Sequence, residues 1–225
     1  MSENKPLTGY PSIDKPWLKY YNEEAIKTPL PEMTMYQYIW EKNQNNLNEI
    51  ALEYFSHRIT YKSLFENIEK TAKAFTTAGI HRGDIVIIAS VTLPETIYAI
   101  YGLNRIGAIP DMVDPRTSTE GIRDYIKEVS ATMVLTIDVA YPKIVSSSAQ
   151  TTVNQIVTLS AYDSMPVLLR TGLRIKDTFV KKKVTSSIKT LNWDEFVAAG
   201  IQEPLTPVQY RLNECAMIVH TGGTT

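Results

Sequence analysis

The sequence lacks the features that mark several large classes of protein. It has one cysteine, Cys215, among 225 residues, which excludes an internal disulfide and predicts a reducing compartment. The longest nearly apolar run, Ile85 to Val91, is far shorter than the roughly 18–20 residues of a membrane-spanning helix. The opening stretch, MSENKPLTGYPSIDKPW, has no apolar segment of the kind found in secretory signals. We therefore expect a cytoplasmic protein with no transmembrane segment.

Charge and short motifs exclude further classes. The 23 Lys and Arg residues nearly balance the 24 Asp and Glu residues, so no basic surface predicts a nucleic-acid partner. Neither G-x-G-x-x-G nor G-x-x-x-x-G-K-[ST] occurs, which argues against a Rossmann dehydrogenase and a Walker-type NTPase. His57 and His81 lie at turn-like positions, and no acidic residue or cysteine stands at ligand spacing from His220. We predict no metal site and no catalytic side chain in this chain.

The first part of the chain is rich in proline. Residues 1–33 contain Pro6, Pro11, Pro16, Pro29 and Pro31. Because proline removes a backbone donor and is not tolerated inside helices, we predict an extended lead-in over 1–33 that packs on a larger core at 34–225.

Residues 34–225 alternate between helical and strand patterns. Helices are predicted over Met35–Asn45, from Thr60 to Gly79, from Pro94 to Arg105, from Ser118 or Thr119 to Val129, and over Trp193–Ala199. A hairpin or a kinked strand is predicted at Ile50–Phe55 and Arg58–Thr60. Strands are predicted at Ile85–Ser90, Ile109–Val113, Met133–Ile137, Gln155–Leu159 and Cys215–Val219. This alternation predicts an α/β fold with layered α/β/α architecture and a mainly parallel sheet.

The end of the sequence carries the strongest functional signal. An apolar strand, in which Cys215 is expected to be a core residue, runs into His220-Thr-Gly-Gly-Thr-Thr. Glycines let successive N–H groups converge on one anion, and threonine hydroxyls add donors, so Thr221–Thr225 is suited to phosphate. A strand and loop of this kind are normally followed by a helix, so we expect the chain to be part of a longer protein.

Three motifs resemble the adenylate-forming superfamily, which includes acyl-CoA synthetases, peptide-synthetase adenylation domains and firefly-type luciferases. The segment 58–64, Arg-Ile-Thr-Tyr-Lys-Ser-Leu, is similar to the early x-T-Y-x-E-L motif, with Ser63 at the usual acidic position. The segment 104–116 is similar to A-G-A-x-x-x-x-x-N/D-P. The segment 220–225 is similar to the first half of the phosphate loop Y-T-S/G-G-T-T-G-x-P-K, with His220 at the aromatic position.

The resemblance implies the N-terminal portion of an enzyme that uses ATP, Mg²⁺ and coenzyme A to activate a carboxylic acid. Thr221, Gly222, Gly223, Thr224 and Thr225 would contact the nucleotide phosphates, whereas Gly107-Ala108 and Asp114-Pro115 would be structural. The lead-in, with Lys15-Pro-Trp-Leu, and Gly222 are most similar to fatty-acid ligases. The lysine of the phosphate loop and the adenine, ribose and magnesium motifs lie further along in the family, so we expect this chain alone to be inactive and to hold no cofactor.

Three alternatives remain open, together with one physical expectation. The chain is also compatible with an aryl-acid or amino-acid adenylating domain, with a non-catalytic scaffold that keeps the first half of the fold, or with an unrelated α/β nucleotide binder, which would bind ATP by itself. A missing covering layer would leave an exposed apolar face near Cys215–Val219, and we expect self-association through that face.

Overall fold

The structure is a computed structural model that describes residues 7–166, 187–202 and 204–220. The chain divides into two compact units, Met1–Glu32 and Met33–Thr225. No helix in the described ranges is long and apolar enough to cross a membrane.

The described part of the first unit contains three short helical segments, α1 (Pro11–Asp14), η1 (Pro16–Tyr20) and α2 (Glu23–Lys27). Pro11 and Pro16 open two of them, at the first helical position, where the missing N–H removes no helical hydrogen bond. The lead-in is therefore partly helical where the proline content predicted extended chain. Its packing on the larger unit stays a prediction.

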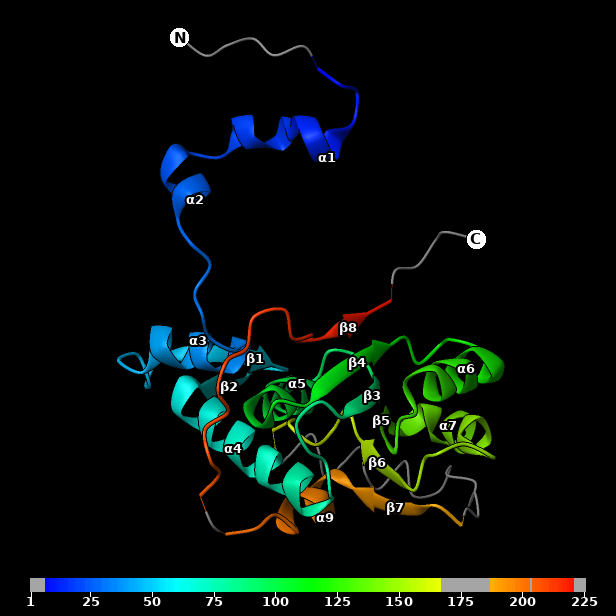
Figure 1. Cartoon of the computed structure of the whole chain (residues 1–225). Coiled ribbons are helices and arrows are strands. Elements are labelled where there is room, and N and C mark those ends of the chain that lie inside the picture. Colours follow the sequence, from blue (N-terminus) through cyan, green and yellow to red (C-terminus); the bar gives the residue numbers. More distant parts are fainter. Residues whose placement is uncertain (1–6, 167–186, 203, 221–225) are drawn as a thin grey trace. The chain divides into compact units, whose positions relative to one another are not determined.

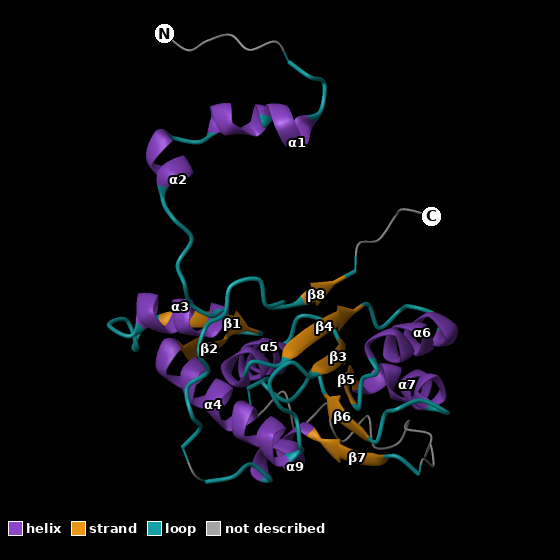
Figure 2. Ribbon diagram, viewed as in Figure 1, coloured by secondary structure: helices purple, strands orange, loops and turns teal. Residues whose placement is uncertain are grey.

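The second unit follows the predicted alternation. Its elements are α3 (Met35–Asn43), β1 (Ile50–Tyr54), β2 (His57–Thr60), α4 (Tyr61–Thr77), β3 (Ile85–Ala89), α5 (Pro94–Ile106), β4 (Ile109–Val113), α6 (Thr119–Val129), β5 (Met133–Ile137), η2 (Asp138–Ala140), α7 (Tyr141–Ser148), β6 (Gln155–Leu159), β7 (Lys189–Asn192), α9 (Trp193–Ala198) and β8 (Ile218–Val219). Figure 1 shows these elements in sequence colours and Figure 2 by type.

Six strands form one sheet in the order β7-β6-β5-β3-β4-β8, and all five neighbouring pairs are parallel. β1 and β2 form a separate antiparallel hairpin. The predicted layered α/β fold with a mainly parallel sheet is confirmed. Because β4 and β5 lie on opposite sides of β3, the chain reverses its direction of travel across the sheet after β4.

Local sequence signals place the helix ends. The Ser63 N–H donates to Oγ1 of Thr60 at the start of α4, and the Gly121 N–H donates to Oγ of Ser118 at the start of α6. Gly107 ends α5 with φ of 76°, in the left-handed region that glycine adopts without strain. These caps confirm the predicted starts of α4 and α6 and the predicted end of α5.

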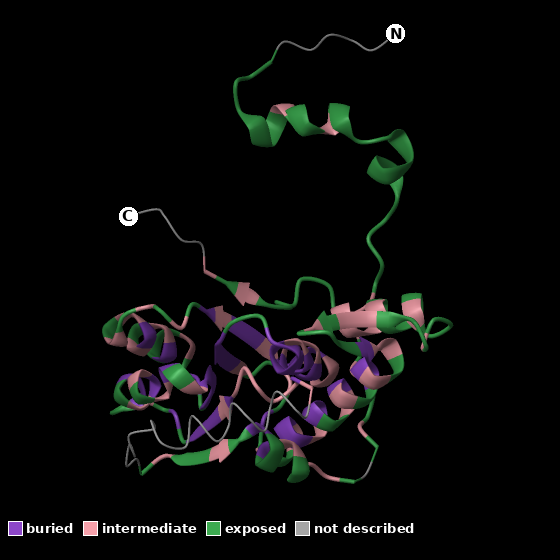
Figure 3. Cartoon of the chain, turned by 180° about the vertical axis from the view of Figure 1, so that it is seen from behind, coloured by how far each residue is buried: buried purple, intermediate pink, exposed green. Residues whose placement is uncertain are grey.

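Helices cover both faces of the sheet. On one face α4, α5 and α9 pack over Val86, Ile88 and Leu135, and on the other α6 and α7 pack over Ile87 and Val134. All five of these strand residues are fully buried. Figure 3 shows burial concentrated in the central strands and in the helix sides that face them.

Three elements differ from the sequence-based expectation. Neither β7 nor α7 was predicted. The predicted core strand Cys215–Val219 was wrong: only Ile218–Val219 is a strand, and Cys215 is exposed. β8 pairs with β4 on one side and has no second neighbour among the described strands. Its side chains therefore stay partly or largely exposed although they are apolar. Val219 is 60% exposed, in agreement with the exposed apolar face predicted for this stretch.

Candidate functional site

The candidate site lies at the edge of the sheet where the parallel strands end. β3 ends before Ser90, β4 before Asp114, and β8 before His220. The connection from β3 leads to β4 and the connection from β5 leads to β6, so the chain leaves these two adjacent strands in opposite directions. In open α/β sheets, ligands bind outside the carboxyl ends of the strands near such a reversal.

An open depression of about 510 Å³ occupies this edge. Its lining comes from the turn after β3, the last two residues of β4 and the turn after β4: Ser90, Val91, Thr92, Met112, Val113, Asp114, Pro115 and Arg116. The turn after β3 is held by Thr96, whose hydroxyl donates to the Val91 carbonyl oxygen at 2.8 Å. This hydrogen bond fixes the turn that forms one side of the depression.

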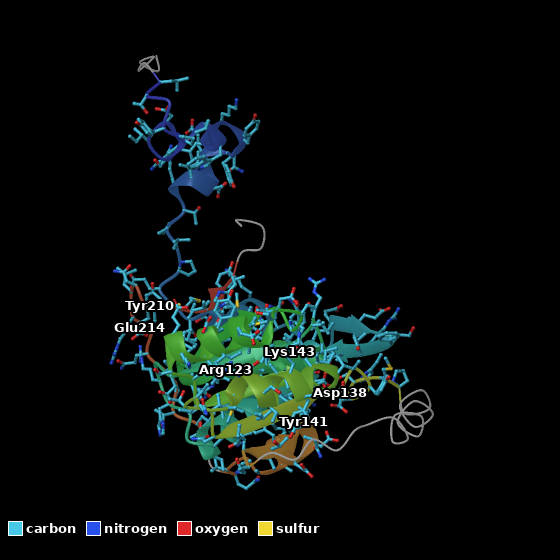
Figure 4. The ribbon with its side chains drawn as sticks, turned by 90° about the vertical axis from the view of Figure 1, so that its right-hand side faces the viewer. Arg123, Asp138, Tyr141, Lys143, Tyr210 and Glu214 are labelled. Carbon is cyan, nitrogen blue, oxygen red and sulfur yellow. The ribbon has the colours of Figure 1, made fainter. Side chains whose placement is uncertain are left out.

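The turn after β4 is fastened by two cationic side chains. Arg116 donates from Nη2 to Oδ2 of Asp114 at 2.7 Å and from its backbone N–H to Oδ1 at 2.8 Å. These hydrogen bonds lower the pKa of Asp114 to about 2. Lys143, on α7, donates to the carbonyl oxygens of Pro115 at 2.9 Å and Thr117 at 3.0 Å. Figure 4 labels Lys143 on α7 and Arg123 on α6.

Beside this turn, three side chains from three elements meet. Nε2 of His220 lies 2.7 Å from Oδ1 of Asp111 on β4, and an ionised carboxylate there accepts the ring N–H. The Tyr125 ring on α6 lies 4.0 Å from the His220 ring, centroid to centroid, at an interplanar angle of 31°. His220 is thus held by a hydrogen bond in the plane of its ring and by an aromatic ring against its face.

Asp111 is an unusual residue for a sheet interior. Its side chain is fully buried, and Oδ2 has no hydrogen-bond partner among the described residues. Burial raises the pKa of Asp111 above its ordinary value, and the hydrogen bond from His220 lowers it in part. Glu128, on α6, raises that pKa further through like charge.

The predicted site residues have different outcomes. Thr221, Gly222, Gly223, Thr224 and Thr225 lie outside the described residues, so their role stays a prediction. His57 and His81 are exposed, as expected from their turn-like positions. Across the described ranges, no group of three His, Cys, Asp or Glu side chains could hold a metal ion.

Sequence reasoning missed three residues at this edge. Asp111 had a signal: it is the one acidic residue inside the strand sequence Ile-Pro-Asp-Met-Val. Nothing in the sequence indicated that Lys143 or Tyr125 lies at a site, because lysine and tyrosine are common on amphipathic helices. Cys215 was placed in the core but lines a small cavity of about 100 Å³ near Met35 and Gly107.

The fold and the site together define a class. The molecule has a parallel α/β sheet with an open depression at the carboxyl edge, next to the strand that precedes the Gly- and Thr-rich sequence 221–225. The chain belongs to the AMP-binding enzyme family, whose model matches residues 39–225.

Curated relatives match most of this chain. A long-chain-fatty-acid–CoA ligase of Bacillus subtilis strain 168 is 24% identical over 216 residues, covering 94% of this chain and 38% of the relative. An acetyl-coenzyme A synthetase of Streptomyces avermitilis is 29% identical over 171 residues, covering 76% of this chain and 25% of the relative. The chain therefore spans well under half the length of these two proteins.

Solved structures share the fold. A long-chain-fatty-acid–CoA ligase from Archaeoglobus fulgidus superposes with a TM-score of 0.64 at 17% identity, covering 88% of this chain and 36% of that one. An anthranilate CoA ligase in complex with anthranoyl-AMP gives a TM-score of 0.66 at 16% identity, covering 87% of this chain and 33% of that one. At these identities the likeness is evidence of the fold.

Proposed function

We propose that this chain is the N-terminal part of an AMP-forming acyl-CoA ligase, which joins a carboxylic acid to the thiol of coenzyme A. The observation that carries the proposal is the family match over residues 39–225. The names of the two relatives above, a long-chain-fatty-acid–CoA ligase and an acetyl-coenzyme A synthetase, support a CoA ligase within that family.

The proposed reaction has two steps. A carboxylate oxygen of the acid attacks the α-phosphorus of ATP, the bond from that phosphorus to the bridging oxygen breaks, and pyrophosphate leaves with its electron pair. The coenzyme A thiolate then attacks the acyl carbonyl carbon, and AMP leaves as the thioester forms. Positive charge supplied to the phosphates, in part by Mg²⁺ bound with ATP, stabilises the charge that moves onto pyrophosphate.

We propose a fatty acid as the acid. The Bacillus subtilis relative, a long-chain-fatty-acid–CoA ligase, matches 94% of this chain, so its similarity extends into the lead-in, where Lys15-Pro-Trp-Leu lies. An aryl or amino acid is the alternative, and a panel of acids in the exchange assay below separates these substrates.

Within this chain we assign the phosphate contacts to Thr221, Gly222, Gly223, Thr224 and Thr225. They follow His220 directly, and β8 ends at the same edge of the sheet as β3 and β4. Glycine backbone N–H groups and threonine hydroxyls are donors suited to phosphate oxygens.

We further propose that the 225-residue chain does not catalyse adenylation by itself. Its phosphate-contacting segment contains no cation, and the chain spans 38% of the Bacillus subtilis relative. The test is ATP–pyrophosphate exchange with a panel of carboxylic acids, run on the 225-residue chain and on any longer product of the same gene. We expect no exchange from the chain and acid-dependent exchange from the longer product. Exchange catalysed by the chain contradicts the inactivity.

The gene itself supplies the second test. We expect the codons after Thr225 to continue with Gly-x-Pro-Lys, and a stop codon would favour the scaffold alternative. In the longer product, Thr221→Val and Thr224→Val should each lower exchange by about 10-fold or more, because each removes a hydrogen bond to a charged phosphate. The matched control is Thr190→Val on β7, the strand at the opposite edge of the sheet from β8, which should leave exchange unchanged.

A further inference from the structure

β8 is held to the sheet by very little backbone. It comprises two residues, Ile218 and Val219, and pairs with Asp111 and Met112 of β4. It has no second strand beside it among the described residues, and neither of its residues is fully buried. Apolar burial and strand pairing, which hold the central strands, therefore contribute little to the position of β8.

A specific polar contact compensates for this. The hydrogen bond from His220 to Asp111 joins residues 109 positions apart, at the point where the chain leaves β8. Asp111 accepts this bond with Oδ1 while Oδ2 lies buried without a partner among the described residues. A buried carboxyl with an unpaired oxygen is costly, and an apolar residue would pack better at that position in the strand.

We propose that Asp111 is a positioning residue that acts through His220 to hold the carboxyl end of β8 on the sheet. Tyr125 completes the arrangement, because its ring against His220 limits rotation of the imidazole and keeps Nε2 directed at Asp111. The inference deepens the proposed function and rests on it, since β8 leads directly into the residues assigned to phosphate.

The arrangement also makes the attachment of β8 depend on pH. The titratable groups that act on Asp111 are His220, after β8, and Glu128 on α6. Tyr125 on α6 packs against His220, and β3 contributes no charged residue. Release of β8 exposes the Asp111 carboxyl to water, whereas the attached state buries it and raises its pKa. The attached state thus binds a proton that the released state gives up, and attachment strengthens as the pH falls through the range between the ordinary and the raised pKa.

Hydrogen exchange of the 225-residue chain tests this without nucleotide. The readout is the protection factor, corrected for intrinsic exchange at each pH, of the Ile218 and Val219 amides, compared with amides of β3 and β5. Asp111→Ala removes the acceptor, and Asp111→Asn keeps an acceptor oxygen but removes the charge. The control is Thr136→Val, which removes another buried hydrogen bond of the same sheet, from the Thr136 hydroxyl to the Ala89 carbonyl oxygen.

We expect Asp111→Ala to lower protection of β8 at least about 10-fold more than protection of β3 and β5, because the hydrogen bond between Asp111 and His220 is lost. Asp111→Asn should keep β8 protected to within about 3-fold at neutral pH and abolish the pH dependence. His220→Phe keeps a ring against Tyr125 but lacks the donor, so it should also release β8. If Asp111→Ala does not fold, His220→Phe takes its place in the test.

The inference is overturned if Asp111→Ala, or His220→Phe in its place, leaves β8 as protected as in the parent chain. It is also overturned if the variant lowers β8 and core protection equally, as Thr136→Val should, or if Asp111→Asn retains the pH dependence. Because the measurement needs neither ATP nor acid, its failure is distinguishable from a failure of the exchange assay that tests the proposed function.

Discussion

β3 and β8 lie one strand apart in the same sheet and are held in place by different forces. All five residues of β3 pair with β4, three of them also pair with β5, and four are buried. β8 has two residues, pairs on one side, and leaves Val219 60% exposed. The centre of the sheet is stabilised by apolar burial, whereas the β8 edge is positioned by a few polar contacts.

The polar contacts extend along the segment before β8. The Arg105 guanidinium donates to the carbonyl oxygens of Leu205 and Thr206, each at 3.1 Å, and forms an ion pair with Glu69 on α4. Further along, Arg82 forms an ion pair with Glu214. Figure 4 labels Glu214 and Tyr210 on this segment. Directional contacts of this kind hold a segment beside the edge where β3 and β4 begin, without requiring it to be buried.

The largest expected effect on the free energy of unfolding comes from truncating an isoleucine to alanine in β3, compared with the same truncation in β8. Ile88→Ala in β3 should lower the free energy of unfolding by about 2–5 kcal/mol, because the side chain is fully buried and leaves a cavity. Ile218→Ala in β8 should cost less than about 1 kcal/mol, because that side chain is only partly buried. Urea unfolding of both variants measures the difference. Equal losses would show that the edge is stabilised by apolar burial after all.

An intermediate effect is expected from Arg105→Ala. The Arg105 side chain is 11% exposed, so its loss leaves two carbonyl oxygens and Glu69 without their partner. We expect a loss of about 1–3 kcal/mol in urea unfolding and faster protease cleavage near residues 205–211. The matched control is Arg58→Ala, whose ion pair with Glu53 is mostly exposed and should contribute less than about 1 kcal/mol. Unchanged cleavage in Arg105→Ala would mean that other contacts hold the segment.

The smallest effect is a pH dependence within the buried region. Glu95, on α5, is 3% exposed, and burial raises its pKa, although a hydrogen bond from Ser164 lowers it in part. The folded state therefore holds a proton that the unfolded state releases, and stability should fall as the pH rises from the ordinary glutamate pKa through the raised one.

Glu95→Gln should remove that contribution to the slope, which urea unfolding at several pH values between 4 and 8 would reveal by comparison with the parent chain. The matched control is Glu53→Gln on β1, which makes the same substitution at a carboxyl exposed on the surface. Parallel slopes for the parent and Glu95→Gln would show that Glu95 does not titrate differently in the two states.

Local patterns in the sequence predicted the elements that bury an apolar face. β3 was predicted from Ile85-Val-Ile-Ile-Ala, α5 from Pro94 and Gly107, and β5 from Met133–Ile137. β7, with the sequence Lys-Thr-Leu-Asn, was missed because its pairing with β6 makes it a strand, and nothing in its own residues indicates one. Cys215 was misplaced for the converse reason, since an apolar run becomes a buried strand only where other elements cover it.

The sequence by itself determined the α/β class, the position of most helices and strands, and the resemblance to an enzyme family. These follow from hydrophobic periodicity and capping residues, which act over a few positions along the chain. Only the tertiary structure decided the strand order, the pairing of β8 with β4 and the meeting of Asp111, Tyr125 and His220. Such contacts depend on which distant segments pack side by side, and that is decided by burial and pairing over the whole sheet.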